Sequence, residues 1–422
     1  MQPFTLLIKP SGSDCNVACE YCFYRCRAAE IGRGRQRMSE EVLHRLVKDY
    51  MELRLPMSGF AWQGGEPTLM GLDFYRKAVE WQVKYGVSGQ QAGNSLQTNA
   101  ILLDDEWCRF LHEARFLVGI SIDGPRELHD HYRLDLGGHG TWDRVMRAID
   151  CCKRHEVEFN TLTLVNNLTA EHPDEIFDFL LELGVRYLQF IPCVEVDPQT
   201  GQIAAFSVSP EQYGRFLCRI FDRWLEVGPD KLSVRDFDSL LSYCIGGRHT
   251  ICTFDRQCSQ YIVIEHTGDV FPCDFFVEPQ SRLGNILETP IEQIAASAKK
   301  KAFAREKQSL SNKCLVCRHL AVCRGGCMKD RAPRGEGILP LCPGGILLRE
   351  QQGQDALATE EQGQDVLATE DKGRMPSPRD SLSRESYFCE SYQRFFDYAL
   401  PRLMQVAAKI QSGSLVRPEQ LT

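Results

Sequence analysis

Short apolar runs alternate with longer amphipathic stretches over the first 235 residues. The apolar runs predict six strands: Thr5–Ile8, Gly59–Gln63, Ser95–Thr98, Leu117–Ile122, Asn160–Val165 and Tyr187–Ile191. Between them, apolar residues at helical spacing predict helices over Glu40–Glu52, Leu72–Tyr85, Asp105–Ala114, Thr141–His155 and Pro173–Leu183. This alternation is typical of a parallel sheet. We expect an α/β fold, an open or partial barrel over residues 1–235, with its chemistry at the carboxyl ends of the strands.

The pattern changes in the second half of the chain, where cysteines become dense and glycines and polar turns interrupt the periodicity. Residues 236–330 and 385–400 are predicted to form a small domain that bound metal stabilises, because such a segment cannot build a sufficient apolar core alone. Residues 331–384 are rich in Gln, Glu, Asp and Ser and contain a near-repeat of ten residues, which predicts a flexible insertion.

Helical spacing returns over Tyr392–Ile410, where Pro401 is expected to kink the helix or to begin a new one. Residues 401–422 are assigned to this C-terminal helix and tail.

Composition and charge exclude several classes of protein. The chain has 422 residues, a net charge of −8 and no basic footprint for nucleic acid. It has no apolar stretch long enough to span a bilayer, and Met1–Pro10 lacks the pattern of a signal peptide. We therefore expect a cytoplasmic protein that binds neither nucleic acid nor membrane. Nineteen cysteines in a reducing compartment indicate metal binding rather than disulfides.

Three cysteines follow the first predicted strand. Cys15, Cys19 and Cys22 stand in the string Cys-Asn-Val-Ala-Cys-Glu-Tyr-Cys. Iron–sulfur clusters normally take four thiolates, so three on one loop can hold three corners of a four-iron cluster and leave one iron open. Zinc usually recruits a second ligand pair at its own spacing, and none lies nearby in the sequence. The loop favours a cluster with an open position.

Glycines and polar residues follow two later strands. After the second strand, Gly64 and Gly65 allow close approach of a ligand, and the Glu66 carboxylate can accept hydrogen bonds from an ammonium group. After the fourth strand, the Ser121 hydroxyl can hydrogen-bond a ribose, and the Arg133 guanidinium can bind a carboxylate with two hydrogen bonds. Taken alone, such residues are usually a turn, a buried strand serine and a surface cation.

These motifs resemble those of the radical S-adenosylmethionine enzymes. Cys15-x3-Cys19-x2-Cys22 is similar to their cluster loop, and Gly64-Gly-Glu-Pro67 to the segment that holds the methionyl amino group. The resemblance implies a partial (β/α)6 barrel of the TIM type and a four-iron cluster whose open iron is chelated by S-adenosylmethionine. It implies cofactor-binding roles for Tyr21, Gly64, Gly65, Glu66, Ser121, Arg133 and Val194.

Eight later cysteines resemble the SPASM extension of this family, which holds two auxiliary four-iron clusters. The family's ligand pattern assigns an inner cluster to Cys252, Cys258, Cys273 and Cys327, and an outer cluster to Cys314, Cys317, Cys323 and Cys389. Cys342 is the alternative to Cys389 because it is nearer in sequence. The string Tyr-Phe-Cys-Glu-Ser-Tyr around Cys389 favours Cys389.

Several strings across nearly the whole chain, such as Phe-Pro-Cys-Asp-Phe-Phe-Val, resemble the anaerobic sulfatase-maturating enzymes. This resemblance implies oxidation of a Ser or Cys of an unfolded or nascent sulfatase polypeptide to Cα-formylglycine. A 5′-deoxyadenosyl radical removes a hydrogen from the substrate Cβ, Asp274 accepts the hydroxyl or thiol proton, and the remaining electron leaves through the auxiliary clusters. A flavodoxin or ferredoxin is the expected electron donor, and the enzyme is expected to be a monomer.

Two other readings are open at this point. A SPASM enzyme that cross-links or epimerises a ribosomal peptide has the same fold and a different product. An electron carrier or zinc-based binding module holds about two metals, whereas three clusters hold about twelve irons, so an anaerobic iron and sulfide assay separates these classes.

Overall fold

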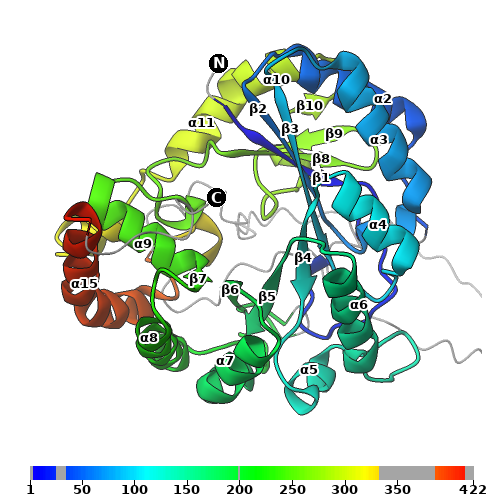
Figure 1. Cartoon of the computed structure of the whole chain (residues 1–422). Helices are drawn as coiled ribbons and strands as arrows, with labels where there is room; N and C mark the ends of the chain where they lie inside the picture. The colour runs from blue at the N-terminus through cyan, green and yellow to red at the C-terminus, as the bar shows by residue number, and fades with distance from the viewer. Residues whose placement is uncertain (1–2, 25–34, 198–199, 332–384, 414–422) are drawn as a thin grey trace, which may run out of the picture.

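The computed structural model describes residues 3–24, 35–197, 200–331 and 385–413. Within these residues the centre is one open sheet of ten strands, ordered β10-β9-β8-β1-β2-β3-β4-β5-β6-β7 (Figure 1). The strands are β1 (Thr5–Lys9), β2 (Met57–Trp62), β3 (Gln91–Thr98), β4 (Leu117–Ser121), β5 (Phe159–Val165), β6 (Tyr187–Pro192), β7 (Ser233–Val234), β8 (Tyr261–Glu265), β9 (Asp269–Phe271) and β10 (Gly284–Asn285). All neighbours from β1 to β7 are parallel, so their carboxyl ends meet at one edge.

Helices cover the outer side of this sheet (Figure 1). They are α2 (Glu40–Glu52), α3 (Leu72–Tyr85), α4 (Asp105–Glu113), α5 (Arg126–Tyr132), α6 (Trp142–Arg154), α7 (Pro173–Glu182), α8 (Pro210–Val227) and α9 (Arg235–Gly246). The main core lies between these two layers and includes the fully buried side chains of Leu6, Trp62 and Phe190. The fold is thus the predicted partial barrel.

All six predicted strands and all five predicted helices of the barrel are confirmed, with small shifts at their ends. Helices α5, α8 and α9 and strand β7 were not predicted. The start of α8 does carry a sequence signal, because Ser209 and Gln212 form a reciprocal capping box around Pro210.

The sheet continues beyond the barrel into the cysteine-rich half of the chain. Strand β8 pairs in parallel with β1, which places Glu265 opposite Lys9, and β9 and β10 follow as antiparallel strands. Short helices complete this half: α10 (Ile291–Ala296), α11 (Ala298–Glu306), α12 (Asn312–Leu315) and α13 (Leu320–Cys323). The domain boundaries proposed above stay predictions. The sheet itself is shared by both halves.

The C-terminal helix α15 (Cys389–Gln411) passes through Pro401 as one helix and packs on α8 and α9. Its buried face includes Phe395, Phe396 and Leu403. The predicted insertion, apart from Arg331, lies outside the described residues. No helix in the described part of the chain is long and apolar enough to cross a membrane.

Candidate functional site

The three-cysteine loop lies at the carboxyl end of β1 and is hydrogen-bonded to the end of α5 and the segment after it. The Ala18 N–H donates to the Leu134 carbonyl at 2.7 Å, and the Glu20 N–H donates to the Tyr132 carbonyl at 3.1 Å. Burial, and then Glu66 and the two other thiols of the loop, raise the pKa of Cys15. The structure therefore brings the three predicted thiols together around one position.

The Gly64-Gly65 pair docks the end of β2 on this loop. Gly64 has a φ of +117°, and a Cβ on Gly65 would lie 2.1 Å from the Asp14 carbonyl oxygen. The Gly65 N–H donates to the Gly12 carbonyl at 2.8 Å. The sequence predicted close approach of a ligand here. In the structure, the chain's own backbone already requires both glycines.

Glu66 is fully buried and its carboxylate is held by four hydrogen bonds. Oε1 accepts from the Thr68 N–H at 3.0 Å, from the Thr68 hydroxyl at 2.6 Å and from the Thr98 hydroxyl at 2.7 Å, and Oε2 accepts from the Asn99 N–H at 2.8 Å. Burial raises the pKa of Glu66, and these donors oppose the rise. The Asn99 amide nitrogen also lies 3.7 Å from the Cys15 sulfur. An acidic acceptor of fixed orientation thus stands beside the cysteine loop.

Asp123, which the sequence analysis did not assign, is the centre of a buried network in the site. Arg133 donates to it from Nε at 2.9 Å, and the Tyr21 hydroxyl also donates to it. The Arg133 Nη1 atom lies 3.8 Å from the Cys19 sulfur. Arg133 is therefore a buried cation paired with the chain's own carboxylate, and the predicted Tyr21 belongs to the same network. Asp123 stands in the string Ser-Ile-Asp-Gly, which was its sequence signal.

His129 supports this network from α5, and its tautomer follows from its neighbours. The Asp123 N–H donates to Nδ1 at 3.3 Å, so Nδ1 carries no proton. The Thr141 hydroxyl donates to the Arg133 carbonyl, so it accepts from His129 Nε2 at 3.0 Å. Burial, and then Arg133, lower the pKa of His129 to about 3. A neutral imidazole is thus built into the support of Asp123.

Ser121 and Val194, the two other predicted cofactor contacts, lie at or just past the carboxyl ends of β4 and β6. Ser121 is half-buried and accepts a hydrogen bond from the Gln97 side chain at 3.1 Å. Val194 is fully buried, and its neighbour Cys193 packs in the same small apolar cluster as Cys19.

Asp274 lies at the carboxyl ends of β1 and β2, in contact with residues that were not predicted. Lys9 Nζ is 2.5 Å from Asp274 Oδ1 and 3.1 Å from Glu265 Oε1. The Tyr24 hydroxyl donates to Asp274 Oδ2 at 2.7 Å, and the Gln63 amide donates to the same oxygen at 3.3 Å. Burial opposes ionisation of Glu265, but Lys9 holds its pKa below the ordinary value. A buried lysine between two carboxylates favours an ionised Asp274.

The structure places the eight later cysteines in two groups of four, and their roles as cluster ligands stay a prediction. In the inner group, burial raises the pKa of Cys273 to about 12, and Cys258 and Cys252 add to the rise. The same three thiols, after burial and Asp330, raise the pKa of Cys327. All four sulfur atoms therefore share one region.

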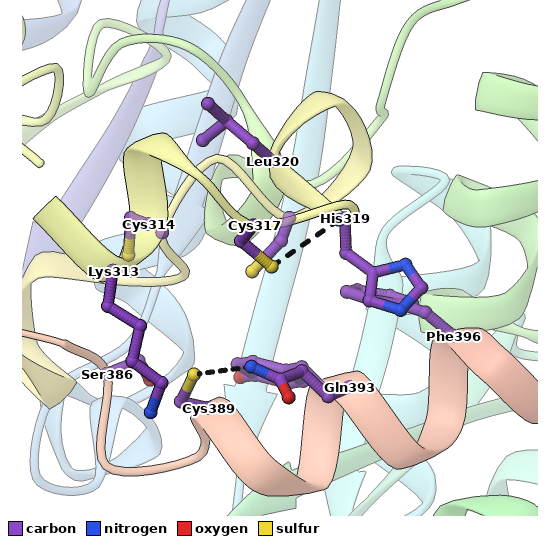
Figure 2. Close-up of a pocket in the computed structure, with 12 residues that line it drawn as sticks. Lys313, Cys314, Cys317, His319, Leu320, Ser386, Cys389, Gln393 and Phe396 are labelled. Carbon is purple, nitrogen blue, oxygen red and sulfur yellow. Dashed lines mark hydrogen bonds between the residues drawn. The ribbon is translucent and has the colours of Figure 1, made fainter. Parts of the chain in front are cut away.

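Figure 2 shows the outer group, in which Cys314, Cys317 and Cys389 face one pocket that Cys323 also lines. The Gln393 amide donates to the Cys389 sulfur at 3.3 Å. Cys342 lies outside the described residues. None of the described cysteines forms a disulfide, and two groups of four thiols suit two four-iron clusters.

Comparisons with known proteins agree with this geometry. The family model "Radical SAM superfamily" matches residues 10–180, and the SPASM model, an iron–sulfur cluster-binding domain, matches residues 252–318. A serine-type anaerobic sulfatase-maturating enzyme of Bacteroides thetaiotaomicron is 39% identical over 364 residues, covering 81% of this chain and 88% of that protein. The chain belongs to the anaerobic sulfatase-maturating enzymes.

Further comparisons support this membership. A cysteine-type anaerobic sulfatase-maturating enzyme of Clostridium perfringens is 34% identical and covers 97% of this chain and 100% of that protein. The solved structure "Native anSMEcpe with bound AdoMet and Cp18Cys peptide" superposes with a TM-score of 0.80 at 34% identity, over 97% of this chain and all of that one. The S-adenosylmethionine-bound structure of Streptococcus suis SuiB, with a TM-score of 0.58 and 16% identity over 81% of this chain and 77% of that one, shares the fold alone.

As a member of this family, the chain is a radical oxidoreductase that uses S-adenosylmethionine and three four-iron clusters, as the sequence predicted. The cross-linking or epimerising alternative has no support among these sulfatase-maturating relatives. The zinc-based alternative is excluded by the family.

Proposed function

We propose that this family member oxidises one Ser or Cys side chain of a sulfatase polypeptide to Cα-formylglycine, with Asp274 as the proton acceptor. The observation that carries the role of Asp274 is its position: its carboxylate lies between Lys9 and Tyr24, at the strand ends that also carry the three-cysteine loop. Relatives of both the serine type and the cysteine type support the substrate class.

Cys15, Cys19 and Cys22 would hold the cluster at which S-adenosylmethionine binds, and the cofactor would supply the radical chemistry that takes one hydrogen atom from the substrate Cβ. Glu66 would accept the methionyl ammonium group, because its carboxylate is already oriented by Thr68, Thr98 and Asn99. The Asp123–Arg133 pair would hold the loop around Cys19 in place.

The substrate side chain must lose a second hydrogen as a proton and an electron. Asp274 would take the proton, because Lys9 favours its ionised form and its side chain is 14% exposed. The electron needs an acceptor nearby, and Cys273 of the inner group is the residue adjacent to Asp274. In the cysteine case the thioaldehyde that results is hydrolysed to the aldehyde with release of hydrogen sulfide.

The substitution Asp274→Asn tests this proposal. With S-adenosylmethionine, reductant and sulfatase-motif peptides carrying Ser or Cys, we expect formation of 5′-deoxyadenosine to continue and peptide oxidation to fall about 100-fold or more. Asp269→Asn is the matched control, since Asp269 pairs with Arg282 on the same hairpin outside this site. Peptide oxidation by Asp274→Asn at a rate near that of the unmodified enzyme removes Asp274 from the role.

The proposal also covers the cellular location, the oligomeric state and the electron donor. The buried free thiols of Cys108, Cys151 and Cys152 suit a reducing compartment, which supports a cytoplasmic location. We expect a monomer by size-exclusion chromatography, and a flavodoxin or ferredoxin that replaces chemical reductant in the peptide assay.

A further inference from the structure

Three buried cations lie among the two cysteine groups. Lys300 of α11 is 5% exposed, Lys307 at the end of α11 is 1% exposed, and Arg331 is 3% exposed. Among the described residues, no carboxylate lies within ion-pair distance of any of the three. An unpaired buried charge strongly destabilises a fold, so their positive charge needs a counter-charge of another kind.

Lys300 and Lys307 fasten the loops of the inner group. Lys300 Nζ donates to the carbonyl oxygens of Cys258 at 3.3 Å, Tyr261 at 2.6 Å and Pro272 at 3.0 Å. Lys307 Nζ donates to the Cys252 carbonyl and to the Thr253 carbonyl at 2.8 Å. The two lysines are seven residues apart on one helix, so they share a face, and this face points at the loops of three inner-group cysteines.

Arg331 lies between the two groups. Its guanidinium donates to the carbonyl oxygens of Gly325 at 3.1 Å, Ser309 at 2.9 Å, Lys307 at 2.9 Å and Arg324 at 3.2 Å. Burial lowers its pKa most, and the thiols of Cys327, Cys314, Cys258 and Cys323 oppose this. Arg331 is therefore close to thiols of both groups.

Four thiolates around a four-iron cluster give it a net negative charge, and reduction by one electron makes this charge larger. A cation fixed beside the cluster in a medium of low dielectric stabilises the reduced form more than the oxidised form. It therefore raises the reduction potential. Here carbonyl groups hold the lysines, and among the described residues no carboxylate is close enough to form an ion pair with them.

We propose that Lys300, Lys307 and Arg331 are the counter-charges of the auxiliary clusters, and that Lys300 and Lys307 raise the reduction potential of the inner cluster so that it accepts the electron that leaves the substrate. These are positioning residues, since they act on the cluster through the electric field of their charge and through the cysteine loops that they hold. The inference rests on the ligand groups proposed above.

The test is a redox titration of the full chain in which Cys15, Cys19 and Cys22 are replaced by Ala, so that only the two auxiliary clusters titrate. In Lys300→Met we expect one of the two midpoint potentials to become more negative. The reduced-to-oxidised ratio at a fixed applied potential should then fall about tenfold, or ~59 mV for a one-electron couple. Lys300→Arg should restore it, and Lys301→Met, an exposed neighbour on α11, should leave it unchanged.

Unchanged potentials in Lys300→Met with about eight irons per chain overturn the inference. If Lys300→Met loses irons, the same titration of Lys307→Met decides: a more negative midpoint supports the inference, and an unchanged one overturns it. About four irons in the starting protein would instead overturn the ligand assignment, and the inference with it.

Discussion

The radical site and the auxiliary-cluster region differ in the partners of their buried cations. At the radical site, Arg133 is paired with Asp123, and Lys9 is paired with Glu265 and Asp274. In the auxiliary region, Lys300 and Lys307 donate to carbonyl oxygens, and no carboxylate of the described residues forms an ion pair with them. The buried cations of the first site therefore have carboxylate partners within the polypeptide, whereas we expect those of the second to be balanced by thiolates and iron.

The two regions also differ in what holds them together. The three-cysteine loop is supported by parallel strands and long helices with a shared apolar core. The outer group is carried by α12 and α13, which have four residues each, and by the start of α15. Helices this short are not stable by themselves. We infer that the barrel site is preformed and that the auxiliary region depends on its clusters.

Removal of the clusters gives the largest expected effect and directly tests whether the auxiliary region depends on them while the barrel does not. In protein stripped of iron under anaerobic conditions, we expect backbone amides of 252–331 to exchange hydrogen about 100-fold faster or more, because metal binding and folding are coupled there. Strands β1 to β6 should keep their protection. Hydrogen-exchange mass spectrometry of loaded and stripped protein measures both regions at once.

A variant that loses only one cluster is the control for the removal of all clusters by chelation. Cys323→Ala should lose about four of twelve irons and loosen the segment around α12 and α13, while the barrel stays protected. Equal protection of 252–331 in loaded and stripped protein would show that this region, too, is preformed.

The next largest effect is expected at the Asp123–Arg133 pair. Asp123→Asn leaves Arg133 as a buried cation without a carboxylate, and we expect a loss of about 3 to 5 kcal/mol in the free energy of unfolding. Chemical denaturation of the loaded protein measures it. The control is Asp143→Asn, which breaks an exposed pair with Arg126 and should lower the free energy of unfolding far less, because water screens that pair. Equal losses in the two variants would mean that the Asp123 pair stabilises no more than a surface ion pair.

The barrel could be predicted from sequence because its signals are local. Apolar runs marked the strands, and spaced cysteines and a glycine pair marked the ends of β1 and β2. Because side chains that follow parallel strands meet at one edge, the strand predictions put Cys15, Glu66 and Ser121 at that edge, but their roles came from the family resemblance. The family resemblance also divides the later cysteines into two ligand sets, a division that stays a prediction.

The supporting charges could not be predicted, because their roles depend on tertiary packing. Lys300 is the middle of three consecutive lysines, which in sequence indicate a solvated helix face, and only the packing of α11 on the inner-group loops buries it. Lys9 directly follows a predicted strand, where a charge normally marks the return to solvent. The neutral state of His129 depends on contacts with Asp123 and Thr141, which come from other segments.

The smallest expected effect tests whether the radical site is held by a neutral His129. The pKa of His129 is about 3 in the folded protein and 6.5 ordinarily. A depressed pKa means that the unfolded chain binds the proton first, so stability is full above 6.5 and is lost as pH falls from 6.5 toward 3. Between about pH 7.5 and about pH 5.5 the expected loss is roughly 1.4 kcal/mol.

Unfolding of the loaded protein at these two pH values, with His129→Gln alongside, isolates this contribution. Glutamine can accept from Asp123 and donate to Thr141 but does not titrate, so the variant should lose roughly 1.4 kcal/mol less than the unmodified protein. His139→Gln is the control, because that imidazole is 80% exposed and meets water in both states. If His129→Gln keeps the full pH dependence, His129 is protonated in the folded protein at the lower pH, and a neutral imidazole does not support Asp123 and Arg133.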